Sequence, residues 1–219
     1  MATVNFDVAG AAGPIISRTT NVPVPGNFAF GMEVQITSYE DFAELLGIEL
    51  NNGNWFYLEG DVSGTLNAIQ QSGGGPAVAT RQIWNDGRTS WNYIAGSLAT
   101  TTLSLYVLSG GVWTVLTPLT TTNFTPTRLV VGGSVVFAST SSGIFNYGTI
   151  KIWSAQKSEA ILRAEAFSRK PRDWSSLTFW NPALLASSIN IDRSGNGGNM
   201  TLTGTPTDVT SDPGIPWQR

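Results

Sequence analysis

The stretch Arg128–Arg169, RLVVGGSVVFASTSSGIFNYGTIKIWSAQKSEAILRAEAFSR, decides the fold, because a strand pattern changes into a clear helix pattern only here. The apolar triplet Leu129–Val131 is followed by two glycines and predicts a short strand that ends in a turn. A second strand is predicted over 148–153. Ser158 then marks a helix start, since a serine side chain can cap the first turn. We expect one short helix near 158–168 in a chain of strands.

The chain before this stretch consists of short strand patterns separated by turn residues. In the clearest pattern, 28–36, large apolar residues alternate with small or polar ones, so one face of the strand packs on a core. Further strands are predicted over 43–50, 54–59, 65–70, 78–84, 91–96, 101–108 and 112–116. Of the 219 residues 24 are glycine and only 12% are charged, which is typical of strands joined by tight turns. The sequence therefore predicts an all-β sandwich or barrel.

Three of these patterns, in this order, resemble the laminin-G-like domains of the concanavalin A-like lectin/glucanase superfamily. Trp91–Ala95 resembles one central strand of those domains and Leu105–Val107 resembles its neighbour. The segment 148–153 with the helix after it resembles the end of the domain. The resemblance covers residues 28 to 167 and implies a jelly-roll sandwich of two antiparallel sheets. The superfamily includes enzymes, lectins and interaction modules, so the fold alone does not give the function.

The expected organisation has three parts. Residues 1–27 are interpreted as an N-terminal edge segment, 28–170 as the laminin-G-like jelly roll and 171–219 as an irregular C-terminal arm rich in proline and glycine. Within the arm, short strands are predicted over 177–180 and 200–203.

The segment 192–199 of the arm, DRSGNGGN, resembles one that accompanies laminin-G-like domains in bacteriophage virion proteins. Asp192 and Asn196 are expected to hold a tight turn there through hydrogen bonds from side chain to backbone. Large apolar residues of the arm are expected to be covered by the sandwich or by a partner subunit; these are Trp174, Phe179, Trp180, Leu184, Leu185 and Trp217.

Composition excludes several classes of function. The chain has no cysteine and no histidine, which removes Ser-His-Asp and Cys-His catalysis and most transition-metal sites. The net charge is −3 and the basic residues are scattered along the sequence. No basic cluster is therefore seen that would bind nucleic acid or an anionic membrane. The sequence shows no signal-peptide pattern and no transmembrane run. The resemblance to bacteriophage virion proteins implies a location in the virion, or in the cytoplasm before assembly.

A catalytic site and a metal site are each weighed against simpler interpretations. Glucanases of the superfamily use three carboxylates on one strand, and Glu59 with Asp61 supplies only two, because Ser63 and Gly64 stand where the third would be. No enzymatic activity is therefore predicted. Calcium would need several oxygen ligands, and the spacing of Asp61 and Asp86 does not supply them, so no metal or cofactor is predicted.

A sugar site needs an aromatic ring beside hydrogen-bonding side chains, because a pyranose stacks its apolar face while its hydroxyls pair with polar groups. The best cluster surrounds one turn and contains Trp84, Asn85, Asp86 and Arg88. A second candidate is the pair Asn146 and Tyr147.

Two functions remain open from the sequence. In the first, the chain is a structural or adhesive component of a larger assembly such as a bacteriophage particle, and forms an oligomer through its arm. In the second, it is a carbohydrate-binding lectin module with a sugar site near the Trp84–Arg88 turn. The first is favoured because the apolar content of the arm calls for a partner surface.

Overall fold

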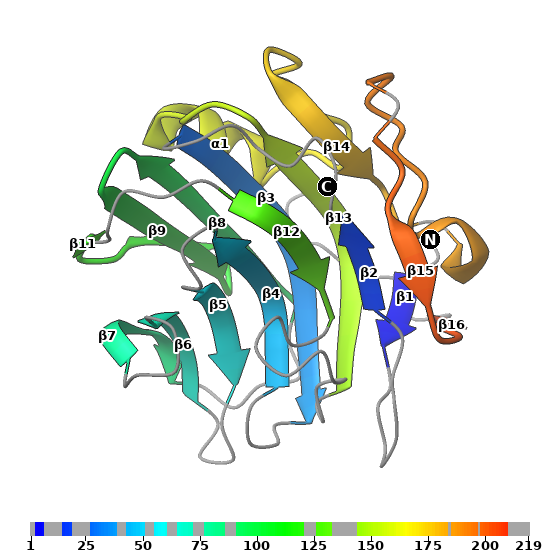
Figure 1. Cartoon of the computed structure of the whole chain (residues 1–219), viewed down its shortest axis with the longest axis horizontal. Coiled ribbons are helices and arrows are strands. Elements are labelled where there is room, and N and C mark those ends of the chain that lie inside the picture. Colours follow the sequence, from blue (N-terminus) through cyan, green and yellow to red (C-terminus); the bar gives the residue numbers. More distant parts are fainter. Residues whose placement is uncertain are drawn as a thin grey trace.

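Two antiparallel sheets form the body of the protein (Figure 1). The computed structural model describes residues 3–6, 15–18, 27–38, 43–50, 55–60, 65–71, 77–85, 91–120, 126–132, 144–183, 185–196 and 198–209. In these ranges one sheet has nine strands and the other seven. The helical elements there are α1 (Glu159–Glu165) and the 3-10 turn η1 (Ala186–Ser188). The predicted jelly-roll sandwich with one short helix is confirmed.

The nine-stranded sheet has the order β10-β9-β8-β3-β13-β1-β16; in addition, β11 pairs with β9 and β14 pairs with β13. Its strands are β1 (Thr3–Phe6), β3 (Asn27–Ser38), β8 (Asn92–Ala99), β9 (Thr102–Ser109), β10 (Val112–Val115), β11 (Leu119–Thr120), β13 (Ile144–Trp153), β14 (Leu177–Asn181) and β16 (Thr207–Val209).

The seven-stranded sheet has the order β15-β2-β12-β4-β5-β6-β7. Its strands are β2 (Ile15–Arg18), β4 (Ala43–Leu50), β5 (Trp55–Gly60), β6 (Thr65–Gln71), β7 (Ala77–Asn85), β12 (Pro126–Val131) and β15 (Thr201–Thr203). The expected strands thus lie within one to a few residues of their predicted positions.

The main core fills the space between the sheets. Alternation along β3 buries Phe28, Phe30, Met32, Val34 and Ile36, as the pattern of large apolar residues predicts. They pack with buried side chains from both sheets, which include Leu46, Ile48, Phe56, Leu58, Ile94, Leu105, Leu129, Val131 and Ile152. The amphipathic strands therefore meet face to face, which is the arrangement of a two-sheet sandwich.

A second, smaller core lies on the other face of the nine-stranded sheet, beneath α1. Leu162 and Ala166 from the helix segment pack with residues that β3, β8, β9, β13 and β14 present to that side; these are Ala29, Tyr93, Ala95, Tyr106, Leu108, Trp153 and Leu177. Ser158 caps the helix as predicted, because its side chain accepts from the N–H of Ile161 at 3.4 Å. One face of the helix is thus fixed to the sheet. No helix in the described ranges is long and apolar enough to cross a membrane.

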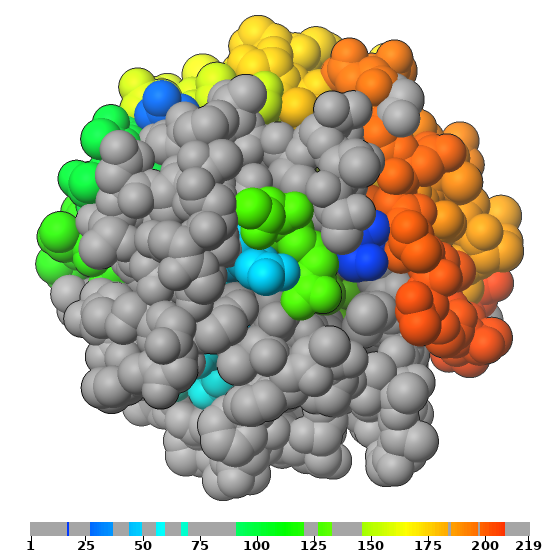
Figure 2. All heavy atoms as spheres, in the orientation of Figure 1, coloured from blue at the N-terminus to red at the C-terminus, as the bar shows by residue number. Residues whose placement is uncertain are grey.

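The two ends of the chain take part in both sheets. β2 lies between β12 and β15, and β1 lies between β13 and β16, so neither N-terminal strand is at an edge. Where an irregular arm was expected, β14 pairs with β13 and the two later strands pair with β2 and β1. The sheet interactions therefore cross the boundary expected at Pro171. In Figure 2 this C-terminal segment forms one flank of the molecule.

The hydrogen bonds predicted from the side chain of Asp192 to the backbone of the 192–199 segment are confirmed, whereas the side chain of Asn196 bonds outside that segment. Asp192 Oδ1 accepts from the N–H of Ser194 at 2.8 Å and from that of Trp180 at 3.0 Å. Asp192 Oδ2 accepts from the hydroxyl of Ser194 at 2.7 Å and from the N–H of Gly198 at 3.1 Å. The side-chain amide of Asn196 donates to the carbonyl of Leu177. One carboxylate thereby joins the turn to β14.

Candidate ligand-binding groove

The first sugar cluster predicted from the sequence lies at the end of β7. The backbone of Trp84 pairs with that of Leu66, and Asn85 pairs with Thr65. Asp86 and Arg88 lie outside the residues that the structure describes. The cluster therefore stays a prediction.

The second sugar candidate is inside the protein. Tyr147 has no exposed surface, and its hydroxyl donates to the carbonyl of Leu45 at 2.8 Å. Asn146 is 5% exposed, and its amide donates to Gln35 Oε1 at 2.7 Å. A sugar cannot stack on a ring that the core covers on both faces. Tyr147 is therefore a core residue in this fold.

The apolar residues expected to contact a partner have different environments. Phe179 is buried in the main core. Trp180 is half-buried, and Trp174, which is 44% exposed, meets it edge to face with ring centroids 5.6 Å apart. Leu185 is 51% exposed. Leu184 and Trp217 lie outside the described residues.

The carboxylate considered for catalysis, Glu59, is buried in β5, where its Cα pairs with that of Glu44 in β4. The second carboxylate, Asp61, lies outside the described residues. No group of three or more potential metal ligands is found in the described part of the chain. The structure therefore describes only one of the two carboxylates considered from the sequence.

A groove opens between α1 and the strands β8 and β9, on the face of the sheet opposite the main core. It has a volume of about 310 Å³. We call it the α1–β9 groove; its lining is Ser97, Ala99, Ser104, Tyr106, Gln156, Lys157, Ser158 and Glu159. Six of these eight residues carry a hydroxyl, an amide or a carboxylate, so the lining of the groove is mostly polar. Its size is at the lower end of the range of about 300–1,000 Å³ that small-molecule pockets occupy.

Two stacked aromatic rings stand at one side of the groove. Tyr106 from β9 and Trp113 from β10 have ring centroids 5.5 Å apart and planes inclined by 17°. The indole N–H of Trp113 donates to Glu159 Oε1 at 3.1 Å. This hydrogen bond connects the edge strand of the sheet to the first turn of α1. It places a carboxylate beside an aromatic surface.

Lys157 lines the groove, but its ammonium group is used elsewhere. Its Nζ donates to Asp173 Oδ2 at 2.7 Å and to the carbonyl and hydroxyl of Ser175 at 2.6 and 2.9 Å. Its backbone N–H donates to the hydroxyl oxygen of Ser97 at 2.9 Å. Burial acts to raise the pKa of Asp173, but hydrogen bonds from Lys157 and Ser175 outweigh it and lower that pKa. The ammonium group is therefore committed to Asp173 and Ser175.

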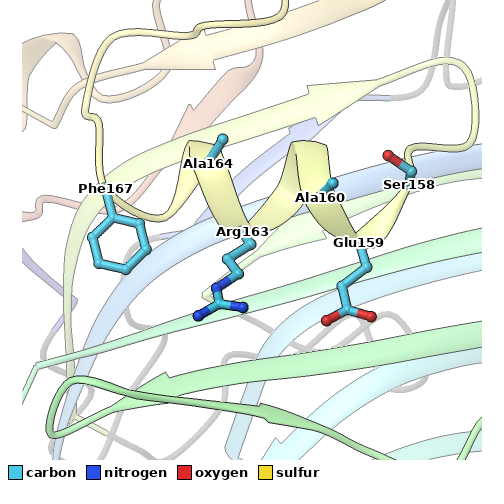
Figure 3. Close-up of a pocket in the computed structure, with 6 residues that line it drawn as sticks. All are labelled: Ser158, Glu159, Ala160, Arg163, Ala164 and Phe167. Atoms are coloured by element: carbon cyan, nitrogen blue, oxygen red, sulfur yellow. The ribbon is translucent and has the colours of Figure 1, made fainter.

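A second hollow of about 590 Å³ continues from the groove along α1. Glu159, Arg163 and Phe167 project to the same side of the helix, as expected for residues four apart (Figure 3). Ser158 and Glu159 line both hollows, so Glu159 stands where they meet.

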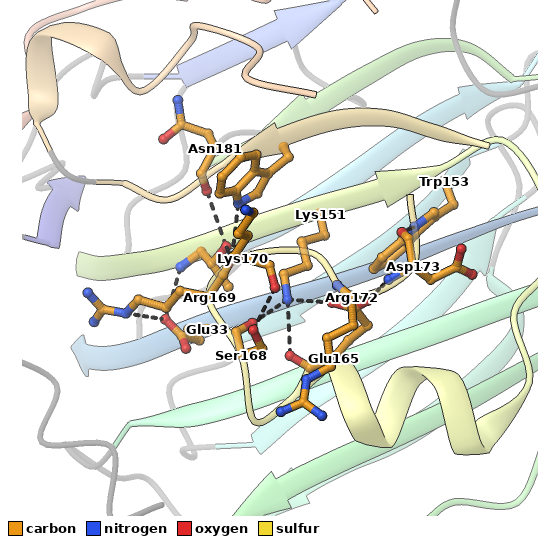
Figure 4. A network of polar contacts seen from close by, with 12 residues as sticks. Glu33, Lys151, Trp153, Glu165, Ser168, Arg169, Lys170, Arg172, Asp173 and Asn181 are labelled. Carbon is orange, nitrogen blue, oxygen red and sulfur yellow. Dashed lines mark hydrogen bonds and ion pairs between the residues drawn. The ribbon is translucent and has the colours of Figure 1, made fainter. Parts of the chain in front are cut away.

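Buried charges hold the helix in place. Lys151 Nζ donates to Glu165 Oε2 at 2.6 Å, and to the carbonyls of Glu165 at 3.0 Å and Ser168 (Figure 4). Glu165 Oε1 accepts from the N–H groups of Arg172 and Asp173 at 2.7 and 2.6 Å. These contacts fasten the segment after α1 onto β13. The helix that walls the groove is therefore fixed at both ends.

Comparisons with known proteins give likeness of fold only. No protein-family model matches the chain, and no curated protein matches it. A heptameric pentraxin from Limulus polyphemus has a TM-score of 0.63 at 9% identity, over 97% of this chain and 96% of the pentraxin. A candidate carbohydrate binding protein from Bacteroides ovatus has a TM-score of 0.67 at 12% identity, over 96% of this chain. The fold is a lectin-like jelly roll.

The match to the Bacteroides protein covers 60% of that chain. Domains LG4-5 of the mouse laminin α1 chain match with a TM-score of 0.51 at 11% identity, over 71% of this chain and 42% of the laminin fragment. The resemblance to laminin-G-like domains is thus supported at the level of the fold. The bacteriophage context stays a prediction.

Proposed function

We propose that this chain is a carbohydrate-binding lectin-like module without catalytic activity. The observation that carries the proposal is the shared fold: nearly the whole chain superposes on a candidate carbohydrate binding protein. A second support is local, because the described surface has a polar groove flanked by stacked aromatic rings. Sugars are recognised by this combination, since they present apolar C–H faces together with many hydroxyls.

The sugar site predicted from the sequence lies at the Trp84–Arg88 turn. Binding of the full-length chain to an immobilised glycan array tests the function, and the variants Trp84→Ala and Asp86→Asn test the site. We expect a saturable glycan signal, and a signal that either variant lowers at least tenfold would support the site at the Trp84–Arg88 turn. Trp174→Ala is the matched control, since it removes an exposed indole outside the turn. Absence of any saturable signal contradicts the function, whereas binding that survives both variants contradicts the site.

A structural role in a larger assembly, such as a bacteriophage virion, is the second candidate. It is supported by the exposed apolar side chains of Trp174 and Leu185 in the C-terminal segment. The bacteriophage context rests on the sequence resemblance of the 192–199 segment alone. Light scattering of the full-length chain and of Leu185→Glu tests this role. An oligomer that the variant dissociates supports it, and a monomeric wild-type chain contradicts self-assembly through this surface.

A further inference from the structure

The α1–β9 groove has the chemistry of a sugar subsite, although no sequence pattern pointed to it. We propose that it binds one neutral sugar residue, with Glu159 accepting hydrogen bonds from the sugar hydroxyls. This inference rests on the proposed function and places its site away from the Trp84–Arg88 turn. The groove lies against the helix-covered face of the nine-stranded sheet, whereas the turn follows β7 in the other sheet.

Glu159 is the principal acceptor of the groove. Its Oε1 is already held by the indole N–H of Trp113 at 3.1 Å. Its Oε2 accepts no hydrogen bond from the residues that the structure describes. Because one oxygen of the carboxylate is already held, the side chain loses little further conformational entropy when its other oxygen binds a ligand. Because a carboxylate accepts strongly from hydroxyl groups, a vicinal diol of a sugar fits it well.

The charge of the groove selects a neutral ligand. The ammonium group of Lys157 donates to Asp173 and Ser175, so it does not neutralise Glu159. The groove therefore presents the carboxylate of Glu159 beside its polar neutral groups, while Arg163, one turn further along α1, lines the neighbouring hollow and not the groove. A sugar acid would bring a second carboxylate close to Glu159, and two like charges in a partly enclosed site repel. Neutral sugars are expected to bind better than their uronic acids for this reason.

The remaining lining supplies the other parts of a sugar site. The indole of Trp113, which is partly exposed and stacks on the buried ring of Tyr106, offers aromatic surface beside Glu159, and such a surface suits the apolar face of a pyranose. Ser104 and Gln156 add neutral donors and acceptors at the groove wall. The volume of about 310 Å³ accommodates a single residue, and the hollow of about 590 Å³ along α1 leaves space for a longer chain.

Titration of the labelled full-length chain with methyl β-D-glucopyranoside and methyl β-D-galactopyranoside tests the proposal, with glucuronic acid as the anionic probe. Proton–nitrogen correlation NMR follows the indole signal of Trp113, assigned with Trp113→Phe, and the side-chain amide of Gln156. We expect both signals to shift with a saturable dependence on at least one neutral glycoside. Glucuronic acid is expected to bind at least tenfold more weakly.

The deciding variant is Glu159→Gln, whose amide oxygen can still accept from Trp113. We expect it to weaken binding of the neutral glycoside about 10-fold or more, because a charge-assisted hydrogen bond is lost. It should also reduce the preference over glucuronic acid. Glu49→Gln is the matched control, since it makes the same charge change on β4 in the other sheet. Thermal unfolding of both variants verifies that each is folded.

The results of these titrations distinguish the proposed sugar site in the α1–β9 groove from the proposed lectin function. Glycoside binding that weakens in Glu159→Gln and is unchanged in Trp84→Ala supports the groove. Binding that is lost in Trp84→Ala and unchanged in Glu159→Gln overturns the groove but keeps the lectin function. Failure of the wild-type chain to bind any array glycan or either glycoside overturns both. Shifts that are equal for neutral and anionic sugars, and unaffected by Glu159→Gln, also overturn the proposed recognition.

Discussion

Lys151 Nζ lies 2.6 Å from Glu165 Oε2, and neither side chain has any exposed surface. The ammonium group also donates to two backbone carbonyls, so its three protons are all satisfied. Burial lowers the pKa of Lys151, although the charge and hydrogen bond of Glu165 oppose this. The pair joins β13 to the end of α1, which means that it couples the sheet to the wall of the groove.

Substituting Lys151 by methionine should destabilise the protein by about 3–5 kcal/mol, because Glu165 would keep a buried charge without its partner. Equilibrium unfolding in urea measures the loss. Lys170→Met is the control, since that side chain is exposed and a surface substitution usually changes stability by less than about 0.5 kcal/mol. Equal stability of Lys151→Met and wild type would show that the pair adds nothing.

The sequence predicts those parts of this fold that depend on local patterns. Phe28 to Ile36 alternate over nine residues, so the strand and its buried face follow from neighbours in the chain. The contact between Trp113 and Glu159 spans 46 residues and arises only when α1 docks beside β10. Lys151 and Glu165 likewise occur on different elements, and either could have been a solvated surface charge. The positions of these residues in the sequence do not indicate that Trp113 meets Glu159 or that Lys151 meets Glu165.

Tyr147 shows a second reason why the candidate site was hard to predict. Simple alternation places Tyr147 and Ile150, three positions apart, on opposite faces of a strand. The pairing of β13 with β3 shifts register between these two residues, and both face the main core. A bulge of this kind changes which side chains are buried. The sequence around Gly148 permits it but does not require it.

Tyr147→Phe should show a pH-dependent loss of stability. Burial raises the pKa of Tyr147 far above 10.0, so the folded chain keeps this proton where the unfolded chain releases it. The contribution of this phenol is therefore complete below pH 10.0 and decreases as the pH rises above it. At neutral pH we expect a cost of about 1 kcal/mol for the lost hydrogen bond to Leu45.

Above pH 10 the difference between wild type and Tyr147→Phe should shrink by up to about 1.4 kcal/mol per pH unit. Urea unfolding of both proteins at a series of pH values provides the measurement. Since the two chains differ at one site, other titrating groups cancel in the comparison. A difference that stays constant through this range would mean that the phenol ionises equally in the folded and unfolded states.

Asp192→Ala should destabilise the C-terminal turn, because four donors lose their acceptor. We expect a cost of about 1–3 kcal/mol, since the N–H groups of Trp180 and Gly198 are partly buried or buried and would be left unsatisfied. Asp192→Asn keeps one acceptor oxygen and should cost less. Hydrogen exchange of the Trp180 amide measures the local effect. Protection that is equal in wild type and both variants would contradict the role of Asp192.

Removal of residues 171–219 should abolish cooperative folding. The truncation takes away β14, which pairs with β13, and the strands that pair with β1 and β2. It also removes the two N–H groups that hold Glu165 and the carboxylate of Asp173 that pairs with Lys157. The buried faces of Trp153 and Ile152 would then be exposed to water along the freed side of β13. Circular dichroism during urea unfolding, with light scattering beside it, should show an aggregated or molten chain. A truncated chain that remains monodisperse and unfolds with a sharp transition would establish the C-terminal segment as a separable arm.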